Sequence, residues 1–182
     1  MGSICLKSER LTLRLIIGSD LYNIHNLHSC PEVDAYNTLG IPKDIDETKA
    51  IIEPWIVENE QEIIKNYVFA IERTEDALFL GLFGLKLNHP KTKRGEIWYK
   101  IHPDFWGKGY ATESTNLVLD YAFDKLELHR LEAGCAVENT GSIKVLEKVG
   151  MTQEGRCRKI LPLKSGWSDN FQYAILETDK RM

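Results

Sequence analysis

The chain lacks the sequence features of several large protein classes. Its four cysteines, Cys5, Cys30, Cys135 and Cys157, lie far apart and form neither a CxxC pair nor a Cys/His spacing. Neither a metal site nor a disulfide framework is therefore predicted. No apolar run approaches the length that spans a membrane, and the first ten residues lack the apolar core of a signal peptide. We expect a cytoplasmic protein that has no metal and no membrane partner.

An excess of positive charge is also missing. The 23 Lys and Arg residues against 27 Asp and Glu residues give a formal net charge of −4, whereas a nucleic-acid-binding surface usually needs a basic excess. Two short basic clusters, at residues 91–94 and 156–159, are interpreted as solvated loops. Nucleic acid is therefore not an expected partner.

The 182 residues have the balance of an ordinary globular protein, with 43% hydrophobic and 27% charged residues. A chain of this length can bury a substantial core. No repeat, low-complexity tract or linker interrupts it, so residues 1–182 are expected to form a single domain.

The first third of the chain predicts one strand followed by helices. Residues 10–15 alternate polar and apolar side chains, as a half-buried strand does. Residues 18–20 offer a helix cap before a run with helical spacing that Pro31 ends. A second helical region is expected over residues 46–66, kinked or divided by Pro54.

Three β-forming runs follow in the middle of the chain. Residues 67–73 and 78–88 are separated by a four-residue turn, and residues 95–102 follow a polar turn. Gly81 and Gly84 inside the second run indicate bulges or a close approach of the backbone. Consecutive strands with short turns predict an antiparallel meander and argue against parallel βαβ units.

The last third alternates helices with strands. A helix over residues 112–126 and a strand over residues 130–137 are predicted first. A short helix follows, begun by cap residues from Asn139 and closed by Gly150.

Two closing strands, over residues 151–159 and 170–178, are expected to be joined by a long turn over residues 161–169. The whole order predicts a mixed α/β (α+β) domain with a central, mostly antiparallel sheet flanked by helices.

A glycine-rich turn at residues 106–113, with the sequence Trp-Gly-Lys-Gly-Tyr-Ala-Thr-Glu, joins the meander to a helix. Small residues let backbone N–H groups approach a phosphate, and a helix N-terminus attracts anions. A P-loop would need GxxxxGK[ST], which this turn lacks. A Rossmann turn would need GxGxxG in a parallel unit, and Thr112 stands where its last glycine would be. Neither pattern fits this turn, and its glycines have the alternative reading that they only allow a left-handed backbone conformation.

This turn resembles the pyrophosphate-binding motif (Gln/Arg)-x-x-Gly-x-(Gly/Ala) of the GNAT superfamily of N-acetyltransferases. With Trp106 in the first position, it resembles the RimJ/RimL branch of that superfamily. Further motifs of the branch follow one another in the expected order, at residues 10–14, 95–99, 139–142, 148–151 and 166–169. The resemblance covers nearly the whole chain and implies a single-domain GNAT-like fold whose central sheet is splayed.

The resemblance implies acetyl-coenzyme A as cosubstrate. Its pyrophosphate would lie on the backbone of residues 107–112, and its pantetheine between the strands at residues 96–102 and 130–137. The implied cofactor-binding residues are Ile101, Trp106, Gly107, Lys108, Gly109, Tyr110, Ala111, Thr112, Asn139 and Ser142.

The implied reaction is a direct attack of a primary amine on the thioester, which requires a base. Glu96 is the first candidate, on the face of its strand opposite the apolar residues, although a solvent-facing glutamate is an equal reading. Glu138 is the second. Asn139 and Ser142 are ordinary helix-cap residues, and the resemblance adds a pantetheine contact for Asn139 and assistance to the leaving thiolate for Ser142.

The amine that accepts the acetyl group is left open by the sequence. A protein N-terminal α-amine is one reading, and a small amine such as an amino sugar, polyamine or amino acid is another. A non-catalytic acyl-CoA-binding protein is the alternative outside the enzymes. The acceptor pocket is expected from residues 22–66 and the turn at 161–169. Homodimer formation through strand edges is a further expectation.

Overall fold

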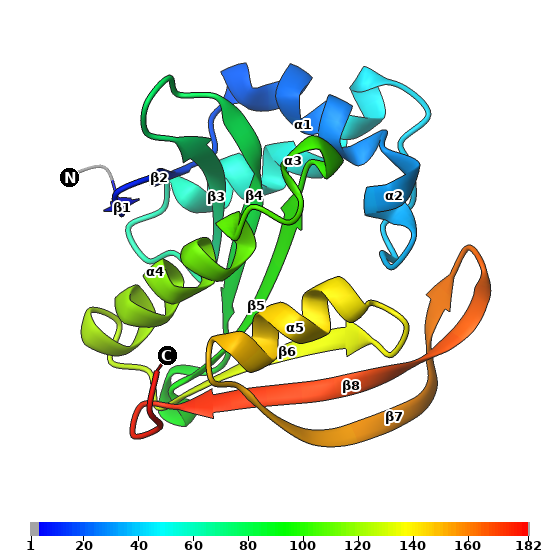
Figure 1. The fold of residues 1–182 in the computed structure, drawn as a ribbon. Helices are drawn as coiled ribbons and strands as arrows, with labels where there is room; N and C mark the ends of the chain where they lie inside the picture. Colours follow the sequence, from blue (N-terminus) through cyan, green and yellow to red (C-terminus); the bar gives the residue numbers. More distant parts are fainter. Residues whose placement is uncertain (1–3, 182) are drawn as a thin grey trace.

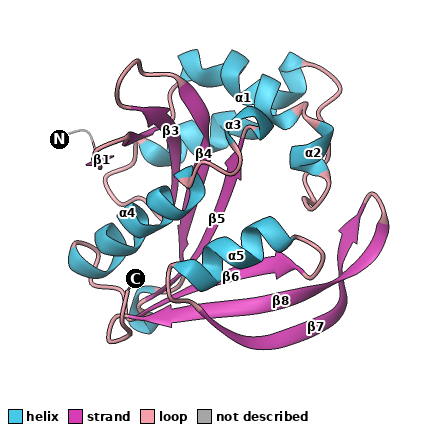
Figure 2. Ribbon diagram, viewed as in Figure 1, coloured by secondary structure: helices cyan, strands magenta, loops and turns pink. Residues whose placement is uncertain are grey.

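The structure is a computed structural model that describes residues 4–181. Residues 1–3 and 182 of the predicted domain lie outside the described part. Its centre is an eight-stranded sheet in the order β1-β2-β3-β4-β5-β6-β8-β7, with helices on both faces (Figures 1 and 2). This arrangement confirms the predicted mixed α/β fold.

The strands are β1 (Cys5–Lys7), β2 (Leu11–Leu15), β3 (Asn66–Arg73), β4 (Phe79–Leu87), β5 (Arg94–Ile101), β6 (Arg130–Ala136), β7 (Thr152–Leu163) and β8 (Gly166–Leu176). The α-helices are α1 (Leu21–His28), α2 (Pro31–Asp34), α3 (Ile45–Asn59), α4 (Tyr110–Asp124) and α5 (Thr140–Lys148).

All neighbouring strands are antiparallel except β5 and β6. These two pair in parallel at only three positions, from Arg94 opposite Arg130 to Glu96 opposite Glu132. Beyond that point they part, and Figure 1 shows them leaving a common base in different directions. The predicted meander and the splay are therefore both present, and they leave a gap between the C-terminal halves of β5 and β6.

The sheet has a hydrophobic core on each face because side chains alternate along a strand. On β3, Phe69 and Ile71 join the core that packs with α4 and α5. Val68 and Ala70 join the core that packs with α1 and α3. In Figure 1, α4 passes in front of β3 and β4, and α3 passes behind them.

Gly81 and Gly84 in β4 allow β5 to approach closely. A Cβ on Gly84 would lie 2.0 Å from the indole of Trp98, and a Cβ on Gly81 would lie 2.0 Å from the carbonyl oxygen of Lys100. The predicted close approach of the backbone is confirmed at Gly81, whereas at Gly84 the close neighbour is the Trp98 side chain.

The second helical region is shorter than predicted. Helix α3 ends at Asn59 instead of residue 66, and Pro54 lies inside it without dividing it. The Asn59 amide exchanges two hydrogen bonds with the backbone of Val68, at 3.1 and 3.3 Å. These two bonds engage the backbone N–H and C=O groups of Val68 and hold the end of α3 against the first part of β3.

The long turn predicted over residues 161–169 is wrong. After a register shift between Cys157 and Leu161, strands β7 and β8 pair again up to Leu163 opposite Gly166, which leaves a two-residue turn. Pro162 lies opposite Trp167 within the hairpin. Proline is tolerated there because β7 is an edge strand, where one side of the backbone needs no partner.

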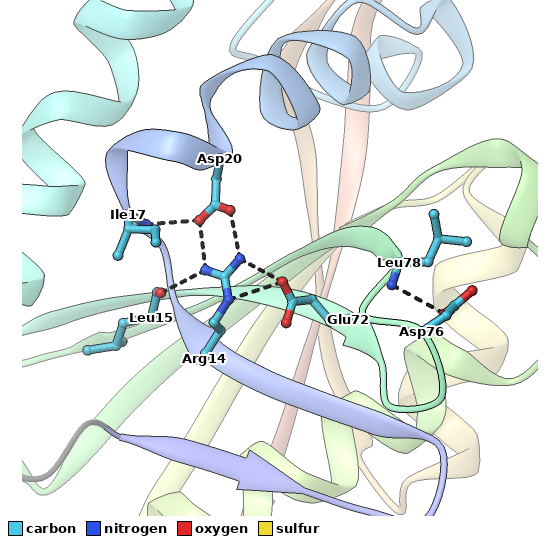
Figure 3. A network of polar contacts seen from close by, with 7 residues as sticks. All are labelled: Arg14, Leu15, Ile17, Asp20, Glu72, Asp76 and Leu78. Carbon is cyan, nitrogen blue, oxygen red and sulfur yellow. Dashed lines mark hydrogen bonds and ion pairs between the residues drawn. The ribbon is translucent and has the colours of Figure 1, made fainter.

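Residues 18–20, the predicted helix cap, form a short 3-10 helix, and Asp20 occupies the N-cap position of α1. The Asp20 side chain makes no cap bond to α1 and instead accepts two hydrogen bonds from Arg14, at 2.8 and 2.7 Å, and one from the backbone of Ile17 at 2.9 Å. Arg14 also binds Glu72 at 2.6 Å (Figure 3). This network ties β2, β3 and the start of α1 together.

None of the helices within residues 4–181 combines the length and the apolar character needed to cross a membrane.

Candidate active site

The glycine-rich turn presents backbone donors at the start of α4. Gly107 and Gly109 have φ values of +74° and +80°, which L side chains rarely adopt. Among the described residues, a Cβ on Gly107 would meet nothing within 4 Å. Glycine is therefore favoured at this position by its backbone conformation, because space for a side chain is available. The first N–H groups of a helix have no partner inside it, and they carry the positive end of its dipole. This geometry fits the pyrophosphate of a coenzyme A thioester.

Side chains of the turn hold it against the end of β5. The Trp106 indole N–H donates to the carbonyl oxygen of Ile101 at 2.7 Å. The Lys108 ammonium donates to the carbonyl oxygen of Asp104 at 2.9 Å. Two of the predicted cofactor-binding side chains are thus engaged within the protein, and the turn offers mainly its backbone.

The N-terminal segment supports the same turn. Arg10 donates to the carbonyl oxygen of Lys108 at 3.2 Å and forms an ion pair with Glu113 in the first turn of α4. Burial opposes ionisation of Glu113, but hydrogen bonds from Ser8 and Arg10 outweigh it and lower the pKa of this carboxyl group. Arg10 also stacks 5.0 Å above the ring of Tyr110, which is buried.

The gap between β5 and β6 offers unpaired backbone. Strand pairing between them stops at Glu96, while β5 continues to Ile101 and β6 to Ala136. The backbone groups of residues 97–101 on this side of β5 therefore have no strand partner. An extended group such as pantetheine can bind there as an added strand does.

Two hydroxyl groups meet between β5 and the start of α5. Asn139 accepts a hydrogen bond from the backbone N–H of Ser142 at 3.1 Å, which confirms it as the helix cap. The Ser142 hydroxyl lies 2.8 Å from the hydroxyl of Tyr99. Burial raises the pKa of Tyr99 although its bond to Ser142 lowers it, so the phenol stays protonated.

Tyr99 is the site residue that sequence reasoning missed. The segment from Asn139 to Ser142 contains no tyrosine, and strand alternation reveals only that Tyr99 shares a face with Ile97 and Ile101. It does not reveal that this face meets the first turn of α5.

The two glutamates considered as bases lie at different places. Glu96 is exposed at the last paired position of β5, opposite Glu132, and its carboxylate has no partner within residues 4–181. Glu138 lies just before α5 and accepts a hydrogen bond from the Ser168 hydroxyl at 2.6 Å. The structure does not bring Glu96 and Ser142 into contact.

Burial lowers the pKa of two titratable groups, the half-buried Lys100 of β5 and the buried His28 of α1. Burial lowers the pKa of Lys100 to about 8, although the charge of Asp34 raises it. His28 is only 2% exposed, and neither of its ring nitrogens has a hydrogen-bond partner among the residues that the structure describes. Burial, and then the charges of Lys100 and His25, lower its pKa to about 3.

No group of three or more His, Cys, Asp or Glu residues within residues 4–181 is arranged to hold a metal ion.

Comparison with known proteins identifies the family of this chain. Residues 10–152 match the family model described as acetyltransferase (GNAT) domain. The uncharacterized N-acetyltransferase YnaD of Bacillus subtilis is 40% identical over 84 residues, which are 46% of this chain and 49% of that protein. The chain thus aligns with about half of the length of this relative.

Two solved structures match over nearly their full length. An acetyltransferase of the GNAT family from Bacillus anthracis is 30% identical with a TM-score of 0.83, and the match covers 96% of this chain and 99% of that one. The spermidine N-acetyltransferase from Vibrio cholerae, solved in complex with CoA and spermine, is 27% identical with the same TM-score of 0.83, and the match covers 94% and 98%.

The family model spans the meander, the glycine turn, the gap and the cap of α5, which are the elements that fit acetyl-CoA. The chain therefore belongs to the family of acetyltransferases with the GNAT domain, and it is an N-acetyltransferase whose acetyl donor is acetyl-CoA.

Proposed function

We propose that this chain transfers the acetyl group of acetyl-CoA to a primary amine by direct attack on the thioester, in the manner of the RimJ/RimL branch. One observation carries the proposal: the glycine turn and the Tyr99–Ser142 pair lie at the C-terminal ends of two strands that part from each other. The turn suits a pyrophosphate, and the hydroxyl pair suits a leaving thiolate.

The donor is held mostly by backbone in this proposal. N–H groups of residues 107–112 bind the pyrophosphate, and the pantetheine lies along β5 up to Ile101 and beside Asn139. Lys108 and Trp106 shape the turn through their bonds to Asp104 and Ile101.

The amine must lose a proton before it attacks, because a lysine amine has a pKa of about 10.4 and an α-amine of about 8. Glu96 takes this proton through water, with Glu138 as the second candidate. The amine nitrogen then bonds to the carbonyl carbon, the carbon–sulfur bond breaks, and the nitrogen releases its second proton to solvent, so that the amide and the coenzyme A thiolate are the products. Ser142, held by Tyr99, donates its hydrogen bond to the departing thiolate.

Two classes of acceptor amine are compatible with the proposed reaction. The branch-like turn with Trp106 favours a protein N-terminal α-amine. The match to an acetyltransferase whose structure contains spermine favours a small amine. An acyl-CoA-binding protein without turnover is the alternative outside the enzymes.

The proposed location is the cytoplasm, supported by the four free cysteines of the described chain, since free thiols suit a reducing compartment. A homodimer through the sheet edges is also proposed. The outermost strands β1 and β7 are the edges available for it, and sedimentation tests it.

The proposed function is tested by release of free thiol from acetyl-CoA with a panel of primary amines and N-terminal peptides. We expect turnover that depends on the amine and a product heavier by one acetyl group in the mass spectrum. Tight binding of acetyl-CoA without turnover on any amine contradicts the enzyme and supports the binding protein.

A further inference from the structure

The thiol of Cys30 and the imidazole of His102 form a pair outside the proposed site of transfer. Cys30 is the N-cap residue of α2, and its Sγ lies 3.5 Å from the Nε2 of His102, the residue that follows β5. Figure 1 shows the corner between α1 and α2 beside the end of β5. Two segments that are 72 positions apart in the chain therefore meet through this pair.

A carboxylate completes the order of a nucleophile, a base and an acid. A thiol is activated when a base lies within hydrogen-bond reach and a third group orients that base. The Nδ1 of His102 lies 3.6 Å from a carboxylate oxygen of Asp104 and 3.4 Å from the backbone nitrogen of the same residue. In the tautomer with its hydrogen on Nδ1, the N–H faces the carboxylate, and Nε2 can accept the proton of the Cys30 thiol.

The surroundings of Cys30 make this base necessary. Burial, and then the charges of Glu32 and Asp104, raise the pKa of the Cys30 thiol. The thiolate is the form that attacks, and little of it forms at neutral pH without a base. A thiolate of raised pKa is the stronger nucleophile once it has formed. His102 should therefore control how fast this thiol reacts.

The chain contains an internal standard for this thiol. Cys30 and Cys157 are both half-buried, whereas Cys5 is exposed and Cys135 is buried, and all four are free. Within residues 4–181, Cys157 makes no hydrogen bond to a histidine. The two half-buried cysteines thus differ in the neighbouring base.

The imidazole also connects this pair to the glycine turn. The His102 ring lies 5.9 Å from the ring of Phe105, and the Lys108 ammonium lies 5.3 Å from the centre of that same Phe105 ring. Lys108 belongs to the turn and donates to the carbonyl oxygen of Asp104 at 2.9 Å. A displacement of His102 would therefore reach the turn through packed side chains.

A group attached to the sulfur of Cys30 would cause such a displacement. The thiol donates to the carbonyl oxygen of Asn26 at 3.3 Å while its sulfur lies against His102. An adduct removes the S–H donor and needs space beside a sulfur that is half-buried. We expect the corner between α1 and α2 to separate from the end of β5.

We propose that Cys30 is a site of reversible modification by small organic disulfides, and that the adduct weakens the binding of acetyl-CoA at the glycine turn. His102 takes the thiol proton, and the Cys30 sulfur attacks one sulfur of the disulfide. The S–S bond breaks, and the leaving thiolate takes the proton from His102. A mixed disulfide and one small thiol result. The effect on acetyl-CoA rests on the proposed role of the turn.

The modification is tested with bis(2-hydroxyethyl) disulfide, which is uncharged and carries no amine. Peptide mass spectrometry over time gives the rate at each cysteine at pH 7. We expect Cys30 to react at least about tenfold faster than Cys157. His102→Gln should lower the rate at Cys30 about tenfold and leave the rate at Cys157 unchanged. Absence of reaction at the buried Cys135 shows that the variant is folded.

Calorimetry without an amine measures the effect on acetyl-CoA. The dissociation constant should rise about fivefold in the modified wild type and return after reduction with dithiothreitol. Cys30→Ser keeps a hydroxyl donor for Asn26 and is the control. It should bind acetyl-CoA within about twofold of the wild type and stay insensitive to the disulfide.

A rate at Cys30 no higher than that at Cys157, or one that His102→Gln leaves unchanged, overturns the modification site. A mixed disulfide at Cys30 with an unchanged dissociation constant overturns the coupling to the turn. If the reduced wild type does not bind acetyl-CoA, the proposed function is contradicted instead, and the rates still decide the reactivity of Cys30.

Discussion

The hydroxyl groups of Tyr99 and Ser142 lie 2.8 Å apart. A substitution that removes one of these hydroxyl groups and little else tests the contact directly. Ser142→Ala removes the group proposed to assist the thiolate, so kcat should fall about 100-fold, the lower end for general acid catalysis. The KM for acetyl-CoA should change little because the turn is untouched. Steady-state kinetics with varied acetyl-CoA gives both values.

Tyr99→Phe is the companion variant. It keeps the ring stacked on Phe83 at 5.8 Å and removes only the hydroxyl. A fall of about tenfold in kcat is expected, because Ser142 remains but loses a polar partner worth about 1.4 kcal/mol. If the kcat of Ser142→Ala equals that of the wild type, Ser142 does not assist the departing thiolate.

Glu96 has a natural control in Glu132, its partner across the two strands. Glu96→Gln should lower kcat/KM about 100-fold at neutral pH, because the amine then lacks its proton acceptor. Glu132→Gln removes the neighbouring carboxylate, which is half-buried and paired with Arg130 and Arg94, and should change the rate by less than about twofold. Equal rates in the two variants, at all pH values, remove Glu96 from the mechanism.

Single residues were predictable from the sequence where their role is local. Asn139 caps α5 through a bond three residues along the chain, and Gly107 and Gly109 adopt left-handed conformations within their own turn. Tyr99 was not predictable as a partner of Ser142, since the two are 43 positions apart and meet only through the packing of α5 on the sheet.

At the scale of elements, the turn before α4 is the part whose backbone conformation matters most. Gly109→Ala forces an L side chain into a φ of +80°, which costs about 1–2 kcal/mol. The dissociation constant of acetyl-CoA should rise about 5- to 30-fold, as calorimetry or inhibition by CoA measures.

Gly141→Ala is the matched control for this substitution. Gly141 lies inside α5, and its Cβ would meet only the Asn139 side chain at 3.7 Å. It should bind acetyl-CoA within about twofold of the wild type. Equal affinities of the two alanine variants contradict the proposed role of the turn.

Most strands were predicted within about one or two residues because alternation and turn residues are local signals. The errors have tertiary causes. Helix α3 ends where Asn59 pairs with β3, and the β7–β8 hairpin extends through Pro162 because β7 has a free edge. Strand β1, with three residues, was missed because so short a segment carries no alternation.

At the scale of the whole molecule, His28 makes stability depend on pH. Its pKa in the folded protein is about 3, below the ordinary 6.5, so the folded state disfavours the proton that the unfolded chain binds. The free energy of unfolding therefore falls as pH drops from about 6.5 towards 3. Between pH 7 and pH 5 the expected loss from this residue is about 2 kcal/mol.

Urea unfolding at the two pH values measures this loss. His28→Leu replaces the imidazole with an apolar side chain and should lose about 2 kcal/mol less than the wild type over the same interval. The wild type should unfold in a single urea transition at pH 7, as expected if residues 1–182 are one domain. Equal pH dependence in the two proteins contradicts the account of His28.

The sequence predicts the proposed binding site of the donor better than it predicts that of the acceptor. In our proposal acetyl-CoA binds mainly to the backbone of short segments, and these segments carry motifs that are visible in the sequence. A cavity beside the β7–β8 hairpin brings together Tyr36, Glu138 and Trp167 from three distant segments. No local pattern connects these segments, so only the fold places them together.

The central claim is that acetyl-CoA binds along β5 and on the glycine turn. Hydrogen–deuterium exchange with and without acetyl-CoA measures this most directly. We expect slower exchange of the amides of residues 97–101 and 107–112, with no change in β2, and weaker protection in Gly109→Ala. Unchanged exchange in the turn at saturating acetyl-CoA, or protection confined to other strands, contradicts the claim.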